Sequence, residues 1–364
     1  MRRIQAEAIL VSILLLLLIF GAPHLLSEFR LNLLSKFLSL AVLALGLDLI
    51  WGYTGILSLG HGVFFGLGGY CMAMYLKLQA SGTDLPDFMM WNGLSEVPAV
   101  WKPMQSFPLA MSCAILIPAS VGTVVAYLTF RSRIQGVYFS ILTQALALVV
   151  SLLLIGQQPY TGGTNGITDF KSILRWSLSE TSTQHGLYFA TVIVLALSYV
   201  LCRWITRGRF GRTLAAIRDA ENRMRYLGYN PVRYKVFVFA VSCALAGVAG
   251  ALYVPQVGII SPANVGIVPS IEMVIWVAVG GRGTLAGAVL GAVLVNAAKS
   301  VFSENLPNLW LYAYGLLFVG TVLFFPGGLV GLMKKIRRKP APIEADPSMP
   351  EHAPEAGAAQ EAAR

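Results

Sequence analysis

A few polar side chains interrupt long apolar stretches of this sequence, and their types define the chemistry open to it. Ser58 and His61 lie in WGYTGILSLGHGVFFGLGGY (51–70), and Asp48 and Glu272 are the two acids inside apolar runs. Placing an ionisable group in hydrocarbon is costly and usually marks a function. His61 should therefore face another helix or a wet passage, either as a hydrogen-bonded packing residue or as part of a pathway for a polar solute.

The two buried acids have structural interpretations as well as functional ones. Glu272 follows Pro269-Ser270, so we expect it in the first turn of a helix, where the helix dipole favours an acid. Asp48 lies near a predicted helix end, within reach of interfacial water. Two isolated acids make a poor proton relay, so uphill transport of a solute would take its energy from another subunit.

Three amides complete the set of candidate pathway residues. Gln144 and Asn296 either contact solute or hydrogen-bond a neighbouring transmembrane helix. Asn165 lies in YTGGTNGITDF (160–170), which is either an ordinary external turn, or a gate or a docking site for a binding protein. The candidates for the solute pathway are thus Ser58, His61, Gln144, Asn165, Glu272 and Asn296.

Several kinds of chemistry are missing from the sequence. There is no GxxxxGK[ST] loop for ATP, no H-E-x-x-H and no G-x-S-x-G. The four cysteines lie in apolar segments without a C-x-x-C pair, which indicates neither a disulfide nor a metal site. We expect no metal, no cofactor and no enzymatic activity in this chain.

The composition is that of a membrane protein. The sequence is 56% hydrophobic and 12% charged, with a mean hydropathy of +0.68. We predict an all-α polytopic protein with about ten transmembrane helices (8–11), and broken or re-entrant helices near 269–300. The predicted spans are 9–26, 32–50, 55–78, 106–130, 134–155, 187–204, 236–256, 269–281, 284–300 and 309–332.

The basic residues give this bundle an orientation. With the N-terminus in the cytoplasm, 20 Lys and Arg residues fall inside and 7 outside, so both termini are predicted to be cytoplasmic. Because these residues occupy short loops, the net charge of +10 does not indicate nucleic acid binding. We assign 1–335 to the transmembrane domain and 340–364 to a disordered cytoplasmic tail.

Glycine pairs mark faces on which helices can approach closely. Gly62 and Gly66 form one G-x-x-x-G pair, and Gly287 and Gly291 form another after a glycine turn at 280–284. Small residues at this spacing are typical of packed membrane helices. We predict that both pairs serve helix packing.

The longest cytoplasmic loop, 202–235, should contain a helix on the membrane surface. Apolar positions in 213–227 share one helical face, Gly228 stands at the C′ position and Pro231 prevents continuation. This helix either only anchors the loop or docks a cytoplasmic ATPase. The candidate coupling residues are Arg218, Asp219, Glu221, Arg223 and Gly228, together with Arg282, whose alternative role is a positive-inside anchor.

Several stretches resemble a known family. The loop helix resembles the ATPase-docking segment of ABC importer permeases, although Asn222-Arg223-Met224 replaces the usual Glu-Ala-Ala. SLGHGVFFGLGGY (58–70) and the run 235–262 are similar to the branched-chain amino acid permease family. TGGTNGITDFK (161–171), LPDFMMW (85–91), 269–292 and FPGGLVGL (325–332) resemble its urea-transport branch.

The resemblance implies a heteromeric importer in a bacterial inner membrane. Two different permeases would form the pathway, two ATPase subunits would bind inside, and a solute-binding protein would deliver solute outside. The sparse charges in the spans favour a neutral nitrogen compound, with urea as the expected solute. The alternatives are a permease for branched-chain or other amino acids, and a passive channel or secondary carrier.

Overall fold

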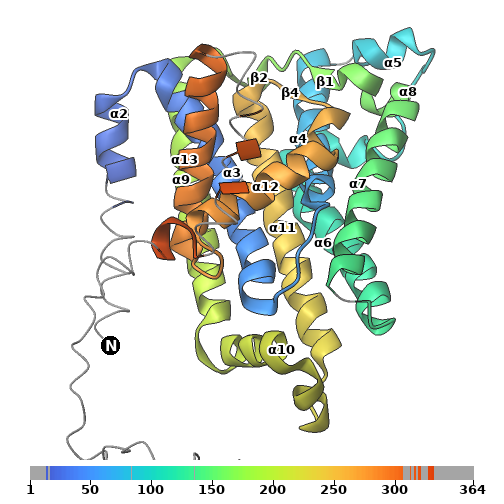
Figure 1. Cartoon of the computed structure of the whole chain (residues 1–364). Helices are drawn as coiled ribbons and strands as arrows, with labels where there is room; N and C mark the ends of the chain where they lie inside the picture. Colours follow the sequence, from blue (N-terminus) through green and yellow to red (C-terminus); the bar gives the residue numbers. More distant parts are fainter. Residues whose placement is uncertain are drawn as a thin grey trace, which may run out of the picture.

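The computed structural model describes residues 17–305 except Thr83 and Gln135, together with Leu14 and residues 312, 315–316, 319–320 and 327–331. The chain is a bundle of long helices with short strands at one end (Figure 1). The elements are η1 (Leu17–Gly21), α2 (Ala22–Leu25), α3 (Glu28–Thr54), α4 (His61–Ser81), α5 (Asp87–Trp91), η2 (Lys102–Gln105), α6 (Phe107–Arg131), α7 (Val137–Gly156), α8 (Gln158–Thr161), η3 (Gly163–Asn165), β1 (Ile167–Thr168), β2 (Ser172–Ile173), β3 (Trp176–Ser177), α9 (Thr181–Thr206), α10 (Gly208–Tyr226), α11 (Pro231–Val257), β4 (Ile259–Ile260), η4 (Pro262–Asn264), α12 (Ile267–Gly280) and α13 (Leu285–Asn305).

Six helices of the described part are long and apolar enough to cross a membrane: α3, α6, α7, α9, α11 and α13. The protein is therefore an all-α polytopic membrane protein, as predicted. At 14 residues, α12 is about 21 Å long, too short to cross a hydrocarbon core of about 30 Å. The predicted span 309–332 lies largely outside the described residues, as does the first half of 9–26.

Burial separates central helices from peripheral ones. In the most apolar 18-residue stretch of α3, 83% of the residues are buried, against 22% in the corresponding stretch of α7 and 28% in that of α6. The central helices α3, α4 and α11 pack against one another, and α11 also packs against α6. The apolar outer faces of α6 and α7 are left for lipid.

The predicted helix 55–78 is wrong at its start. Gly55 has φ +75° and ends α3, and α4 begins only at His61. The intervening segment 55–60 is hydrogen-bonded to α7: Ser140 Oγ donates to Leu57 O at 2.8 Å, and Leu59 N donates to Thr143 Oγ1 at 3.1 Å. Non-helical backbone in a membrane is stable only when protein groups satisfy it in this way.

The two ends of the bundle differ. At one end α10 lies across the bundle, below α3 and beside the start of α11, and at the other end are α5, α8 and the short strands (Figure 1). There β1 pairs antiparallel with β4, which joins the loop before α9 to the chain after α11. Arg131 and Arg203 lie in the last turns of α6 and α9, and Arg282 stacks on Trp51 near the end of α3. The basic loops thus meet at the α10 end.

Candidate functional site

His61 is enclosed between α3, α4 and α11. Its side chain is fully buried, with Nε2 2.8 Å from Ser242 Oγ and Nδ1 2.9 Å from Ser58 Oγ. Ser242 Oγ donates to Gly46 O at 2.6 Å, so it accepts from Nε2–H, and Nδ1 accepts from the Ser58 hydroxyl. Phe64 and Phe239 pack edge-on against the ring. In this conformation His61 has the surroundings of a packing residue, and both its nitrogens are occupied.

The first glycine pair lies against the segment that leads into α12. A Cβ at Gly62 would be 2.7 Å from Ser270 Oγ and 2.8 Å from Val265 O, and one at Gly66 would overlap the Val265 side chain. Gly62 N donates to Ser270 Oγ at 3.1 Å, which satisfies a free amide in the first turn of α4. The absence of side chains at these glycines is what lets α4 approach α12.

The second glycine pair lies between α12 and α13. A Cβ at Gly291 would meet the backbone of Trp276 and Gly280, and one at Gly287 would be 2.7 Å from Gly280 O. The short helix α12 therefore packs directly on the backbone of α13.

Glu272 is not in the first turn of its helix, because α12 begins at Ile267. Its two carboxylate oxygens instead accept from Lys299 Nζ of α13, at 2.7 and 2.8 Å. The pair is partly buried, with 15% of the Glu272 side chain exposed and 30% of that of Lys299. The partner of this acid is a lysine on the next helix, at the end of the predicted span 284–300.

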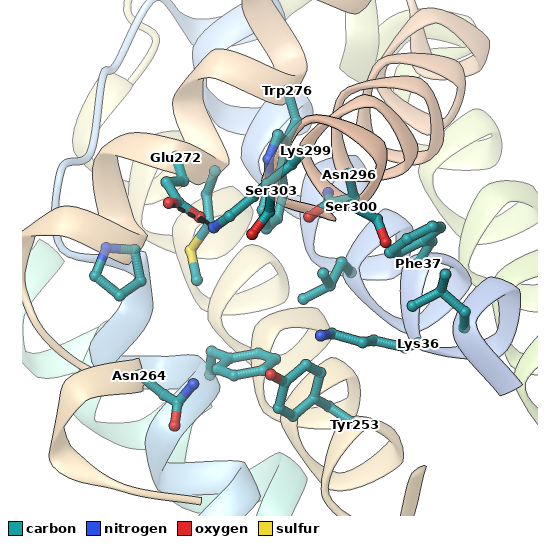
Figure 2. Close-up of a pocket in the computed structure, with 15 residues that line it drawn as sticks. Lys36, Phe37, Tyr253, Asn264, Glu272, Trp276, Asn296, Lys299, Ser300 and Ser303 are labelled. Carbon is teal, nitrogen blue, oxygen red and sulfur yellow. Dashed lines mark hydrogen bonds and ion pairs between the residues drawn. The ribbon is translucent and has the colours of Figure 1, made fainter. Parts of the chain in front are cut away.

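This ion pair lines a cavity of about 360 Å³ between α3, α11, α12 and α13. Figure 2 shows Lys36 of α3 pointing into it from the side opposite Glu272. Asn296, Tyr253 and Trp276 line the same cavity. Of the six candidate pathway residues, the structure brings Glu272 and Asn296 together here.

The other four candidates lie elsewhere. Ser58 and His61 contact each other in the core, Gln144 is half-buried on α7, and Asn165 is exposed in η3. Sequence reasoning missed Lys36, although a lysine five residues into the apolar run 32–50 was the available signal.

The helix α10 begins at Gly208, earlier than predicted, and is kinked at Ala220. Its buried residues include Leu214, Ile217 and Met224, which hold it against the bundle. Gly228 follows the helix with φ +85°, the left-handed conformation that a C′ glycine provides. Arg223 is exposed.

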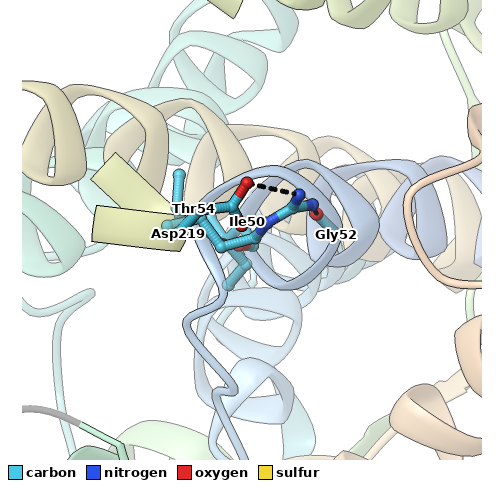
Figure 3. Close-up of polar contacts among 5 residues, drawn as sticks. Ile50, Gly52, Thr54 and Asp219 are labelled. Atoms are coloured by element: carbon cyan, nitrogen blue, oxygen red, sulfur yellow. Dashed lines mark hydrogen bonds and ion pairs between the residues drawn. The ribbon is translucent and has the colours of Figure 1, made fainter. Parts of the chain in front are cut away.

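Arg218 connects α10 to the end of α3. Its Nη1 donates to Gly52 O at 2.8 Å, and its Nε donates to Asp219 Oδ1 at 2.8 Å. Figure 3 shows Asp219 beside the last turn of α3, next to Gly52 and Thr54. The Arg218 guanidinium holds the pKa of the Asp219 carboxyl below its usual range.

Glu221 connects α10 to α11. It accepts from Arg225 Nη2 at 2.6 Å and from Lys235 Nζ, whose side chain is buried. Burial raises the pKa of Glu221, but the hydrogen bonds from Lys235 and Arg225 lower it by more, so the net pKa lies below its ordinary value. Glu221 thus forms a salt bridge between the surface helix α10 and the membrane helix α11.

The turn 281–284 is held by Asp48 of α3. The Asp48 side chain is fully buried and its Oδ1 accepts from Gly283 N at 2.6 Å. Arg282 beside it is exposed, with its guanidinium 5.4 Å from the centre of the Trp51 ring. Asp48 therefore positions this turn rather than reaching interfacial water.

Comparison with known proteins places these features in a family. Residues 29–325 match the family described as branched-chain amino acid transport system, permease component. The chain belongs to this family, and it is therefore the permease subunit of a bacterial ABC importer, a multi-pass subunit that is not itself an ATPase. No solved structure matches the chain.

The curated relatives are distant in sequence, but their matches extend over most of this chain. LivM of Salmonella typhimurium, a high-affinity branched-chain amino acid transport permease, is 26% identical over 342 residues, covering 88% of this chain and 74% of LivM. BraD of Pseudomonas aeruginosa, of the same description, is 24% identical over 299 residues, covering 80% and 91%. LsrC of Yersinia pseudotuberculosis, an autoinducer 2 import permease, is 28% identical over 245 residues, covering 64% and 66%. At these identities the family is established and the solute is not.

Proposed function

We propose that this chain forms one half of the pathway of a heteromeric ABC importer that takes up amino acids. The observation that carries the proposal is the placement of α10. This helix is tied to α3 through Arg218 and to α11 through Glu221, while arginines such as Arg223 face outward. A helix held in this way can transmit the movement of a docked ATPase to two membrane helices at once.

The partners follow from this arrangement. A second, related permease would complete the pathway, two ATPases would bind at the α10 end, and a binding protein would deliver solute at the opposite end. We assign Arg218, Asp219, Glu221, Arg223, Gly228 and Arg282 to the coupling of ATP hydrolysis to transport. Glu272 and Asn296 are proposed to contact solute, and Ser58 and His61 to maintain the core beside the pathway.

Amino acids are preferred over urea for two reasons. Several relatives are described as branched-chain amino acid permeases, and the cavity between α3 and α13 contains three charged side chains, Lys36, Glu272 and Lys299. Urea was expected from the resemblance to the urea-transport branch and from the few charges in the spans, and the second of these expectations does not fit this cavity.

The experiment is to purify the chain with its partner permease and ATPases and to reconstitute the complex in vesicles with the binding protein. We expect ATP-dependent uptake that amino acids stimulate. Stimulation by urea alone would restore urea as the solute. Uptake by this chain alone, unaffected by ATP and by the ATPases, would instead identify a passive channel or secondary carrier.

A further inference from the structure

The cavity lined by Lys36, Glu272 and Lys299 lies in the half of the bundle opposite α10. Lys36 is eight residues after the start of α3 at Glu28, which places it about 12 Å along the helix. Lys299 is in the last two turns of α13. A volume of about 360 Å³ falls in the range of small-molecule sites. The cavity is thus large enough for a small solute entering from the end opposite α10.

The charges in this cavity are unequal. Two ammonium groups, of Lys36 and Lys299, face one carboxylate, and both oxygens of that carboxylate are bonded to Lys299. Within the described part of the chain, Lys36 Nζ has no hydrogen-bond acceptor, and its nearest aromatic partner is Tyr253, with 5.8 Å from Nζ to the ring centre. An ammonium in such a site is stabilised by an anionic ligand.

The side of the cavity that carries Glu272 offers acceptors for a cation. Asn296 Nδ2 donates to Ala292 O at 2.8 Å, its amide oxygen has no donor among the described residues, and Ser300 and Ser303 line the same wall. Phe65, Met273 and Trp276 supply apolar surface between the charged groups.

We propose that this cavity binds the zwitterionic form of an amino acid with an apolar side chain. Lys36 receives the carboxylate of the solute, Glu272 and Asn296 receive its ammonium group, and Phe65, Met273 and Trp276 contact its side chain. Urea carries no anionic group and would leave Lys36 without a partner. This inference rests on the proposed function and adds to it the cavity that holds the solute and the residues that bind each of its groups.

Transport by three variants of α3 tests the site. Lys36→Gln removes the charge, Lys36→Arg keeps it, and Arg30→Gln removes an exposed charge from the same helix outside the cavity. In vesicles that hold the full complex and the binding protein, we expect Lys36→Gln to lower amino acid import at least about tenfold, the loss of one charge-assisted hydrogen bond. Lys36→Arg should retain more import than Lys36→Gln, and Arg30→Gln should match the wild type. Co-purification of the ATPases should be unchanged in all three variants, and basal ATP hydrolysis should match the wild type in Arg30→Gln.

A binding measurement made without the binding protein tests whether the permease itself selects the solute. The detergent-solubilised complex, without the binding protein, is titrated with leucine, isoleucine, valine and alanine, with the amides of these amino acids, and with urea, while tryptophan fluorescence is followed. We expect the amino acids to change the fluorescence and the amides and urea not to, with the signal lost in Trp276→Phe. Lys36→Gln should abolish the preference for amino acids over amides.

The failures of the two proposals are distinguishable. ATP-dependent amino acid import that is equal in Lys36→Gln and wild type, or an equal response to amino acids and amides, would overturn the site and leave the importer standing. ATP-dependent import of urea alone would also overturn the site. Uptake that is independent of ATP and of the ATPases would overturn the proposed function itself.

Discussion

At the scale of single residues, the structure separates polar groups that serve packing from those that face a cavity. His61 and Asp48 are fully buried, His61 bonded to α11 and Asp48 to the turn 281–284, whereas Lys36 points into a cavity. All three are polar residues in apolar sequence, so residue type alone does not distinguish them. The difference lies in which groups the other helices bring to each side chain.

His61→Leu should destabilise the protein without changing its affinity for solute. The substitution leaves the buried Ser58 hydroxyl without its acceptor, which costs about 1–3 kcal/mol, whereas Ser242 keeps its bond to Gly46 O. We expect a lower thermal unfolding midpoint and a lower yield, with an unchanged KM for import per assembled complex. Normal stability with an altered KM would instead make His61 a pathway residue.

Asp48→Leu should be more harmful than Asp48→Asn. Leucine leaves Gly283 N–H without an acceptor in the core, a loss of about 1–3 kcal/mol, whereas asparagine keeps an acceptor oxygen. Thermal unfolding of the purified complex would measure both variants. Equal midpoints would show that the bond to Gly283 does not hold the turn 281–284.

At the scale of elements, the end of α10 depends on the conformation of Gly228. With φ +85° and no atom within 4 Å of an added Cβ, the cost of Gly228→Val is conformational, about 1–2 kcal/mol. We expect weaker co-purification of the ATPases with this variant. Gly228→Asn is the matched control, because asparagine tolerates the left-handed region. Unchanged co-purification in Gly228→Val would count against the coupling role.

The stability that the Glu221–Lys235 salt bridge adds between α10 and α11 should depend on pH. The pKa of Glu221 is lower in the folded chain than its ordinary value of about 4.3. Its ionised form therefore contributes stability that is complete above about pH 4.3 and is lost as pH falls through the folded pKa. The difference in thermal midpoint between wild type and Glu221→Gln should be constant from about pH 7 down to about pH 5.5, and should shrink below about pH 4.3. A difference independent of pH would exclude an ionic tie.

Local patterns in the sequence predicted local structure, but they did not predict contacts between elements that are distant in the sequence. The pattern of apolar positions followed by Gly228 predicted a surface helix and its end, because both depend on residues within a few turns. The break at 55–60 is set by Ser140 and Thr143 of α7, more than 80 residues away in sequence. The pairing of Glu272 with Lys299 depends on how α12 lies on α13, which no local pattern encodes.

At the scale of the whole molecule, a continuous series of contacts joins α10 to the cavity. Arg218 of α10 bonds to Gly52 of α3, and Gly52 packs against Gly283, which Asp48 holds. The turn 281–284 connects α12 to α13, and these two helices carry Glu272 and Lys299. Movement of α10 would therefore be transmitted along α3 and this turn to the charged wall of the cavity.

Arg218→Ala tests this transmission. The variant removes the bond to Gly52 O and leaves the buried anchors Leu214 and Ile217 of α10 in place, so the ATPases should still bind and hydrolyse ATP at the basal rate. We expect amino acid import per ATP hydrolysed to fall about tenfold, since one hydrogen bond from a charged group is lost. Arg209→Ala is the matched control, because Arg209 is an exposed arginine in the first turn of the same helix. Normal import by Arg218→Ala would show that the movement of α10 is transmitted through Glu221 and α11 instead. A loss of ATPase binding in Arg218→Ala would show that this arginine docks the ATPase rather than transmitting its movement to α3.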